Sequence, residues 1–313
     1  MSSLELRGFR ADLPIGAMAA FGCLRVCERN PAFRGSRLGW AMRGVNFPVL
    51  HTPGQASPES LVDALVDDVR KSVSRLELRW SDQIKTATRD SFRAEAQKAI
   101  ENATADNREA ADWFTAFGNE LELDRNGKLE PTPFDMSVAR QRFLGDAVRL
   151  TQSLAQDSKK GKTAAESYHE ALFGPWRYQE DQHSLGWDPT TMKLGAFTHK
   201  APTAMANTGV RAAVWLAFES LPLFPCFYSA GLRVRSFQRD RGGFVFYWPV
   251  WRGAIGLDAL ASLLDIASSG NEEDLVRRGV TALYRSERFK PNQYLASFRT
   301  PELVFGGVAA AAE

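Results

Sequence analysis

The chain has 313 residues, 44% of them hydrophobic, and its 39 basic and 37 acidic side chains give it a formal net charge of +2. That length is enough for one large domain or two ordinary ones, and the sequence has no run of about 20 apolar residues that would form a membrane-spanning helix. Such a small net charge argues only weakly for a nucleic-acid partner, because dedicated nucleic-acid-binding domains are usually far more basic.

The first predicted element is a helix that begins at Pro14, a residue well suited to a first helical turn. Apolar residues recur along it at spacings of three and four and also occupy its opposite face. This pattern predicts a core helix, in which Gly22 permits a close neighbour. The apolar run from Leu13 to Leu24 follows Asp12 and lacks the basic region and cleavage site of a signal peptide, so we expect a cytoplasmic protein.

Further helices are predicted in the first half, over Ser57–Val73, Thr88–Ala103, Asp106–Gly118 and Ser137–Leu154. Asn126-Gly127, between the third and fourth of these, is a strong signal for a β-hairpin. We therefore assign residues 1–156 to a mostly helical region.

Residues 157–162 read Asp-Ser-Lys-Lys-Gly-Lys and are predicted to form a solvated basic linker. Their end looks like that of a phosphate-binding loop, but Gln156 stands where the first glycine should be and no apolar strand precedes it. We therefore predict no nucleotide site there. The linker lysines are nevertheless candidates for contact with nucleic acid: Lys159, Lys160 and Lys162.

The second half of the chain predicts mixed structure. A capping box from Thr163 to Glu166 opens a short helix, and apolar helices are predicted over Thr208–Ser220 and from Leu257. Asn271 is predicted to cap a helix over Glu272–Arg285, with acidic residues at its start and basic residues near its end.

These elements predict an α+β fold with a helical N-terminal half and a C-terminal half of mixed helix and antiparallel hairpin. Residues 163–300 are assigned to an α+β region and 301–313 to a flexible tail. One compact domain is the alternative to this division.

Between the predicted helices of the second half, arginines alternate with apolar and aromatic residues around a Gln-Arg-Asp-Arg-Gly-Gly turn. Because successive side chains of a strand face opposite sides, Arg233, Arg235 and Phe237 are predicted to share one face. A cationic ribbon with interleaved aromatic rings suits a phosphate backbone and its bases. The candidate phosphate contacts are Arg233, Arg235, Arg239 and Arg241. The alternative is an edge hairpin that carries arginine for solubility and buries its aromatic rings.

Basic residues concentrate in two parts of the chain. Residues 1–50 hold seven basic and three acidic groups, and residues 226–256 hold five basic and one acidic. The two segments form one basic stripe only if they meet in space.

The cysteines and histidines predict no metal site, no cofactor and no catalytic residue. Cys23, Cys27 and Cys226 are too few for a disulfide framework. Cys23 and Cys27 share a helix face, but no second Cys or His pair lies near them in sequence, so we expect small buried thiols. The four histidines are isolated from one another.

Short motifs follow one another in a fixed order along most of the chain. They are Leu6-Arg7-Gly8, Leu13-Pro14-Ile15-Gly16, Ala20-Phe21-Gly22-Cys23-Leu24-Arg25, Pro131-Thr132-Pro133-Phe134, Gln141-Arg142-Phe143-Leu144, Leu172-Phe173-Gly174-Pro175-Trp176, Trp187-Asp188-Pro189, Trp215-Leu216-Ala217-Phe218, Leu221-Pro222-Leu223-Phe224-Pro225, Trp248-Pro249-Val250-Trp251 and Leu257-Asp258. The ordered set resembles a CRISPR-associated family of type I-U, now called type I-G, systems. The chain departs from that family at Ile15-Gly16-Ala17-Met18, where a leucine and an aromatic residue are more common.

The resemblance implies either a compact relative of the large subunit of an RNA-guided surveillance complex or an accessory protein associated with the helicase-nuclease. The sequence has no helicase phosphate loop, no His-Asp pair of the nuclease type and no ferredoxin-like RNA-recognition signature. The implied role is therefore non-catalytic: guide pairing reads the sequence, while the protein contacts the backbone of guide RNA or target DNA and other effector subunits.

Two other classes of function fit the sequence. One is a metal-dependent nuclease built on Asp181, Asp188 and His183, although Asp188-Pro189-Thr190 is also ordinary turn chemistry. The other is a scaffold that binds only protein, through an aromatic surface between Leu221 and Trp251.

Overall fold

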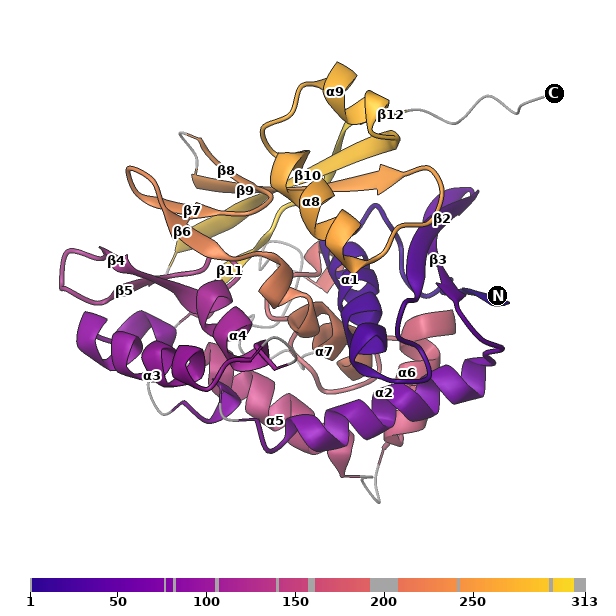
Figure 1. Ribbon diagram of the computed structural model, residues 1–313, viewed down its shortest axis with the longest axis horizontal. Helices are drawn as coiled ribbons and strands as arrows, with labels where there is room; N and C mark the ends of the chain where they lie inside the picture. The colour runs from indigo at the N-terminus through magenta and orange to yellow at the C-terminus, as the bar shows by residue number, and fades with distance from the viewer. Residues whose placement is uncertain are drawn as a thin grey trace, which may run out of the picture.

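The structure of the protein is a computed structural model that describes residues 2–75, 77–80, 83–104, 107–138, 141–156, 161–191, 208–240, 243–292 and 295–306. Helices and antiparallel strands are arranged in several small sheets, so the predicted α+β class is confirmed. In Figure 1 most of the N-terminal helices lie below the largest sheet, α9 lies at the top of the molecule, and α8 lies below α9.

The elements are numbered along the chain. The helices are α1 (Pro14–Arg29), α2 (Pro58–Ser72), α3 (Arg89–Glu101), α4 (Glu109–Phe117), α5 (Phe143–Ala155), α6 (Ala164–Phe173), α7 (Arg211–Glu219), α8 (Leu257–Ala267) and α9 (Glu272–Arg277). The strands are β1 (Ser2–Glu5), β2 (Arg37–Arg43), β3 (Val45–Thr52), β4 (Gly118–Leu123), β5 (Leu129–Pro131), β6 (Cys226–Tyr228), β7 (Leu232–Val234), β8 (Phe237–Asp240), β9 (Gly243–Trp251), β10 (Val280–Asn292), β11 (Leu295–Phe298) and β12 (Glu302–Gly306).

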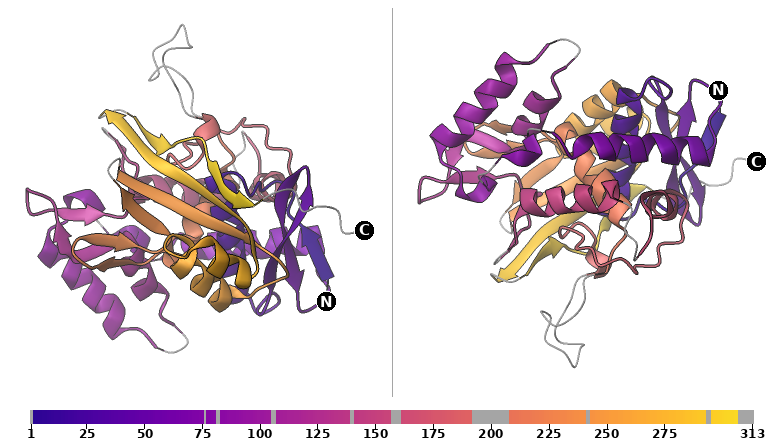
Figure 2. Two further views of the ribbon diagram at one scale, coloured as in Figure 1. Left: turned by 90° about the horizontal axis from the view of Figure 1, so that it is seen from above. Right: turned by 90° about the horizontal axis from the view of Figure 1, so that it is seen from below.

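The largest sheet has the strand order β11-β10-β9-β8, and β12 also pairs with β10. Every pairing in it is antiparallel, and β8 is an edge strand. The N-terminal segment forms a three-stranded sheet, β1-β3-β2, that the sequence analysis did not predict. β4–β5 and β6–β7 are separate two-stranded hairpins (Figure 2). The first of them confirms the hairpin predicted at Asn126-Gly127, and Gly127 there has a φ of +72°.

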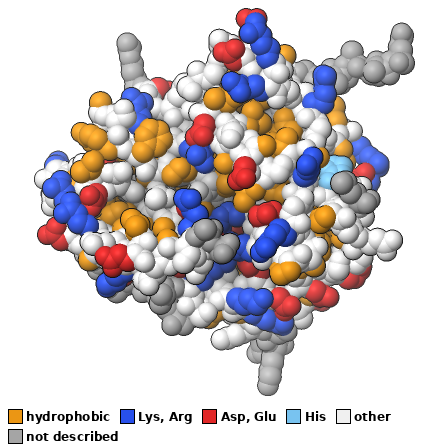
Figure 3. All heavy atoms as spheres, viewed as in Figure 1, with side chains coloured by type: hydrophobic (Ala, Val, Ile, Leu, Met, Phe, Trp, Pro, Cys, Tyr) orange, Lys and Arg blue, Asp and Glu red, His pale blue; other side chains and the backbone are white. Residues whose placement is uncertain are grey.

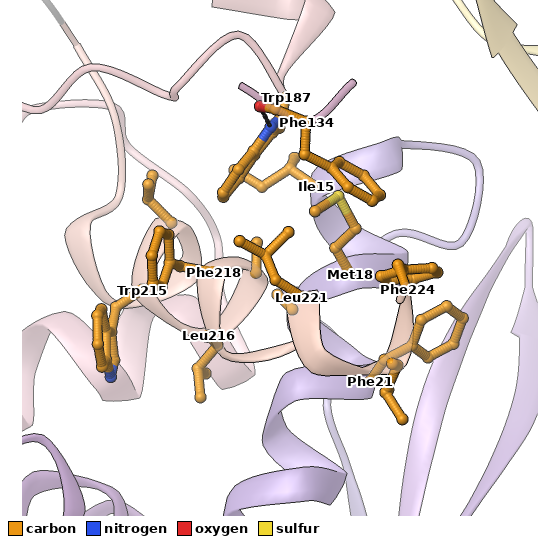
Figure 4. Packing of buried hydrophobic residues seen from close by; sticks show 14 of the residues in the cluster. Ile15, Met18, Phe21, Phe134, Trp187, Trp215, Leu216, Phe218, Leu221 and Phe224 are labelled. Carbon is orange, nitrogen blue, oxygen red and sulfur yellow. Dashed lines mark hydrogen bonds between the residues drawn. The ribbon is translucent and has the colours of Figure 1, made fainter. Parts of the chain in front are cut away.

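Helix α1 is the core helix that the sequence predicted. Its residues from Pro14 to Cys27 are all buried. Gly22 permits the close neighbour, because a Cβ at this position would lie only 1.7 Å from the carbonyl oxygen of Leu216 in α7. Figure 4 shows side chains of α1, among them Met18, beside Leu221 in the segment that follows α7. The same hydrophobic cluster includes residues from both sides of residues 157–162.

The predicted helix start at Ser57 and the predicted capping box at Thr163 are both confirmed. Ser57 Oγ accepts a hydrogen bond from the backbone N–H of Ser60 at the start of α2, and Thr163 does the same for Glu166 at the start of α6. The prediction for Ser137 is wrong, since α5 begins only at Phe143. Ser137 instead accepts a hydrogen bond of 3.0 Å from the Nζ of Lys85.

The helix predicted over Glu272–Arg285 ends early. Asn271 caps α9 as expected, but α9 stops at Arg277, Gly279 takes a φ of +87°, and β10 begins at Val280. β10 is aligned with β9 from Val280 opposite Trp251 onwards. Pairing with β9 from Trp251 to Val245 therefore outweighs the helical pattern. β12 lies within the segment assigned to a flexible tail, and residues 307–313 lie outside the described residues.

Candidate nucleic-acid interface

The arginine-rich segment forms the hairpin that the sequence predicted. β8 pairs with β9, and Arg239 lies opposite Phe244. Arg239 is exposed, and its guanidinium carbon lies 5.4 Å from the centroid of the buried Phe244 ring. The ring therefore supports the guanidinium through a cation–π contact while the charge stays in water. Arg241 lies outside the described residues.

The prediction that Arg233, Arg235 and Phe237 share one face is wrong. Ser236 has a φ of +65° and interrupts the strand, so the alternation does not continue from β7 into β8. Phe237 is buried. Arg235 turns away to Asp265 of α8, with its Nε 2.5 Å from the carboxylate Oδ1. Of the three, Arg233 is exposed, Arg235 is partly exposed and Phe237 is buried.

A second hairpin, β6–β7, places the ring of Phe227 opposite Arg233. In the β6–β7 pairing Phe227 lies opposite Arg233 and Tyr228 lies opposite Leu232. Phe227 is 48% exposed and Tyr228 is 49% exposed, whereas Leu232 is buried. Neither ring was predicted from the sequence, although Phe227 and Tyr228 stand directly before a Ser-Ala-Gly turn that indicates this hairpin.

The two hairpins are neighbours. A Cβ at Gly231, in the turn of the β6–β7 hairpin, would lie 3.9 Å from Nη1 of Arg239 in the β8–β9 hairpin. We refer to Phe227, Tyr228, Arg233 and Arg239 as the hairpin surface. In Figure 1 its strands lie at the upper left, and Figure 3 shows hydrophobic, basic and acidic side chains intermixed over the same view of the molecule.

The arginines of the hairpin surface keep their charge available. Among the described residues, neither Arg233 nor Arg239 forms a salt bridge, and the one hydrogen bond of the Arg233 side chain, 3.4 Å long, is to the carbonyl oxygen of Ser229. The nearby Glu130 is partly buried. Burial raises the pKa of its carboxyl, while Arg288 and Arg239 act in the opposite direction.

Lys162, the one linker lysine among the described residues, does not join this surface. Lys162 pairs with Glu170 of α6, and its carbonyl oxygen accepts a 2.7 Å hydrogen bond from Nη2 of Arg211. α6 lies at the lower right of Figure 1, on the opposite side from the hairpins. Lys159 and Lys160 lie outside the described residues.

The two basic segments meet in space, since the backbone N–H groups of Leu38 and Ile255 each donate to the other's carbonyl oxygen, but not all of their charges lie at the surface. Arg25 and Arg29 of α1 point into a buried ionic cluster, in which both bind Glu109 of α4 and Glu219 of α7. Arg29 also binds Asp68 of α2. The charges of these two arginines therefore link four helices, with Arg25 buried and Arg29 partly buried.

The candidate nuclease residues are not brought together. Asp181 and His183 line a polar groove of about 1030 Å³ between α5 and the segment 179–183. Asp188 does not line that groove: it is buried and accepts a 2.6 Å hydrogen bond from the hydroxyl of Thr190. Burial raises the pKa of its carboxyl. Within the described ranges no three His, Cys, Asp or Glu side chains are grouped as metal ligands, and the three cysteines are buried and free.

The aromatic surface expected between Leu221 and Trp251 is mostly core. Its buried aromatic residues are Phe224, Phe237, Phe244, Phe246, Trp248 and Trp251. Among the described residues of this range, the rings of Phe227 and Tyr228 are exposed and that of Tyr247 is partly exposed.

No family model matches the sequence, and no curated protein matches it. In the part of the chain that the structure describes, no helix has the length and apolar character needed to cross a membrane. A functional assignment therefore depends on the motif order in the sequence and on the geometry of the hairpin surface.

Proposed function

We propose that this protein contacts a nucleic-acid backbone as a non-catalytic component of a type I-G CRISPR effector system. The nucleic-acid contact is inferred from the position of Arg233 and Arg239 on two adjacent hairpins, where both are exposed and neither forms a salt bridge among the described residues. The resemblance of the ordered motifs to the type I-G family carries the placement in a CRISPR system.

The chemistry of the two arginines suits phosphate. A guanidinium presents its N–H donors in a planar fork that matches the oxygens of a phosphate, and it stays charged at every physiological pH. The ring of Phe244 lies under Arg239 and restricts its guanidinium. Less conformational freedom is then lost when Arg239 binds, which favours the contact.

Contacts of this kind recognise the backbone and not the base sequence. They fit a system in which guide pairing supplies the sequence readout. Because Asp188 lies apart from Asp181 and His183, the geometry favours this role over the metal-dependent nuclease.

The test of the phosphate contact is a salt titration of binding to guide RNA and to duplex DNA. Changing Arg233 and Arg239 together to alanine should flatten the log–log dependence of affinity on salt by roughly 0.7 to 0.9 for each lost contact. The matched control changes Arg43 and Arg277, two exposed arginines on β2 and α9, to alanine. If the variant with Arg233 and Arg239 changed to alanine is folded and has an unchanged salt slope, these arginines do not contact phosphate.

The placement in an effector system has its own test. The purified protein should associate with the other type I-G effector subunits or with the helicase-nuclease, and it should not cut nucleic acid in the presence of divalent metal. A gene neighbourhood without CRISPR arrays or effector genes would argue against the placement. Cleavage that a chelator abolishes would argue against the non-catalytic role.

A further inference from the structure

We propose that the β6–β7 hairpin is a stacking platform for unpaired bases, so that the hairpin surface binds single-stranded nucleic acid in preference to duplex. This inference rests on the proposed nucleic-acid contact and adds the form of the ligand. The platform consists of the rings of Phe227 and Tyr228. The proposed phosphate contacts of Arg233 and Arg239 do not explain why these two rings are exposed.

The rings are held at the surface by a buried anchor. Cys226, Leu232 and Val234 are buried, and the Sγ of Cys226 lies 3.6 Å from the carbonyl oxygen of Ala116. This inner side fixes the hairpin against α4, and Phe227 faces outward with Arg233. Tyr228 follows at the end of the strand, where it stays half-exposed although its partner Leu232 is buried.

The combination of ring and cation favours a nucleic acid over a protein as the occupant. Directly opposed residues of an antiparallel pair have Cβ atoms about 4.5 to 5.5 Å apart. A base stacked on Phe227 would therefore bring its phosphate within reach of the Arg233 guanidinium. An apolar protein partner would have to cover that unpaired charge, which is costly.

The exposure of the rings favours a single strand. In a duplex both faces of each base are covered by its neighbours, and stacking on a side chain requires a base that is free of them. Phosphate contacts alone would bind duplex and single strand alike, because both present a charged backbone. A preference for the single strand is thus the property that the rings add.

The experiment compares three probes by fluorescence anisotropy: a short single-stranded oligonucleotide, its duplex, and an abasic strand of the same length. Phe227→Ala and Tyr228→Ala should each weaken binding to the single strand by roughly 5- to 150-fold, the range for one stacked base. Affinity for the abasic strand and the salt slope should not change. Phe227→Trp should retain binding, because it keeps an aromatic face.

The matched control is Leu303→Ala on β12, which removes an apolar side chain that is 51% exposed and far along the chain from the hairpins. It should have no effect on any probe, and thermal unfolding verifies the fold of every variant. The stacking platform is overturned if the alanine variants lose equal affinity for the normal and the abasic strand, or lose affinity for neither. If the arginine variant still flattens the salt slope in that case, the proposed function stands without it.

A third outcome points to a protein. If the wild type binds none of the probes but binds an effector subunit, and Phe227→Ala abolishes that binding, both the platform and the backbone contact are overturned.

Discussion

Glu219 holds the ionic cluster of α1, α2, α4 and α7 together. Its side chain is fully buried, and its carboxylate accepts hydrogen bonds of 2.7 Å from Arg75, 2.9 Å from Arg29 and 3.2 Å from Arg25. Burial alone would raise the pKa of this carboxyl, but the guanidinium groups of Arg29, Arg75 and Arg25 outweigh it and lower the pKa to about 2. The carboxylate is therefore ionised in the folded protein at neutral pH.

Glu219→Gln keeps the shape of the side chain and removes its charge. Breaking a buried ion pair by removing one partner costs about 3 to 5 kcal/mol. Arg29 and Arg25 still bind Glu109, and Arg29 still binds Asp68, so we expect the lower end of that range, about 3 kcal/mol. Urea unfolding followed by tryptophan fluorescence measures this difference. The control, Glu273→Gln, removes an exposed partner of Arg277 and should cost less than about 1 kcal/mol.

The effect depends on pH in a defined direction. Because folding lowers the pKa of Glu219 from 4.5 to about 2, its contribution to the free energy of unfolding is present above about pH 4.5 and is lost as the pH falls towards 2. The stability difference between wild type and Glu219→Gln should therefore shrink over that interval. A difference below about 1 kcal/mol at pH 7, or one that stays constant down to pH 2, would refute this account of the cluster.

Two further substitutions probe the core. Gly22→Ala should destabilise the fold by about 3 kcal/mol, the upper end for overpacking, because its Cβ would lie 1.7 Å from the oxygen of Leu216. Gly54→Ala is the control, since nothing lies within 4 Å of the added Cβ, and equal urea midpoints for the two variants would contradict the helix contact. Changing Cys23 and Cys27 together to serine should cost about 1 to 3 kcal/mol for each hydroxyl left unpaired, with metal content at zero. Elemental analysis that finds stoichiometric zinc in the wild type would contradict their role as buried thiols.

Local signals predicted the parts of the fold that local chemistry controls. The start of α1 at Pro14, the caps at Ser57 and Thr163 and the turn at Gly127 each depend on a few neighbouring residues, and each was found where the sequence placed it. β10 was missed because its partner along the sheet is β9, a contact between distant segments that residue periodicity does not report.

The charges of the sequence were misleading for the same reason. Arg25 and Arg29 look like part of a basic segment, yet both bind Glu109 and Glu219, at least 80 residues away along the chain, and Arg29 also binds Asp68, 39 residues away. Conversely, Phe227 and Tyr228 look like core residues and are exposed. Which arginine stays free, and which ring reaches the surface, depends on tertiary contacts, so the sequence identified the hairpin but only part of its surface.

Lys162 belongs to the basic linker that the sequence predicted as a nucleic-acid contact. A substitution there can distinguish that role from a structural one. Its ammonium group pairs with Glu170, which is 8% exposed, and its backbone binds Arg211. Removing Lys162 leaves the buried carboxylate of Glu170 without this partner, so Lys162→Ala should lower the free energy of unfolding by about 1 to 3 kcal/mol. The salt slope of nucleic-acid binding should not change, whereas Arg233→Ala should flatten it. If Lys162→Ala instead flattens the salt slope and leaves the free energy of unfolding unchanged, the lysine contacts phosphate and its pairing with Glu170 contributes little to stability.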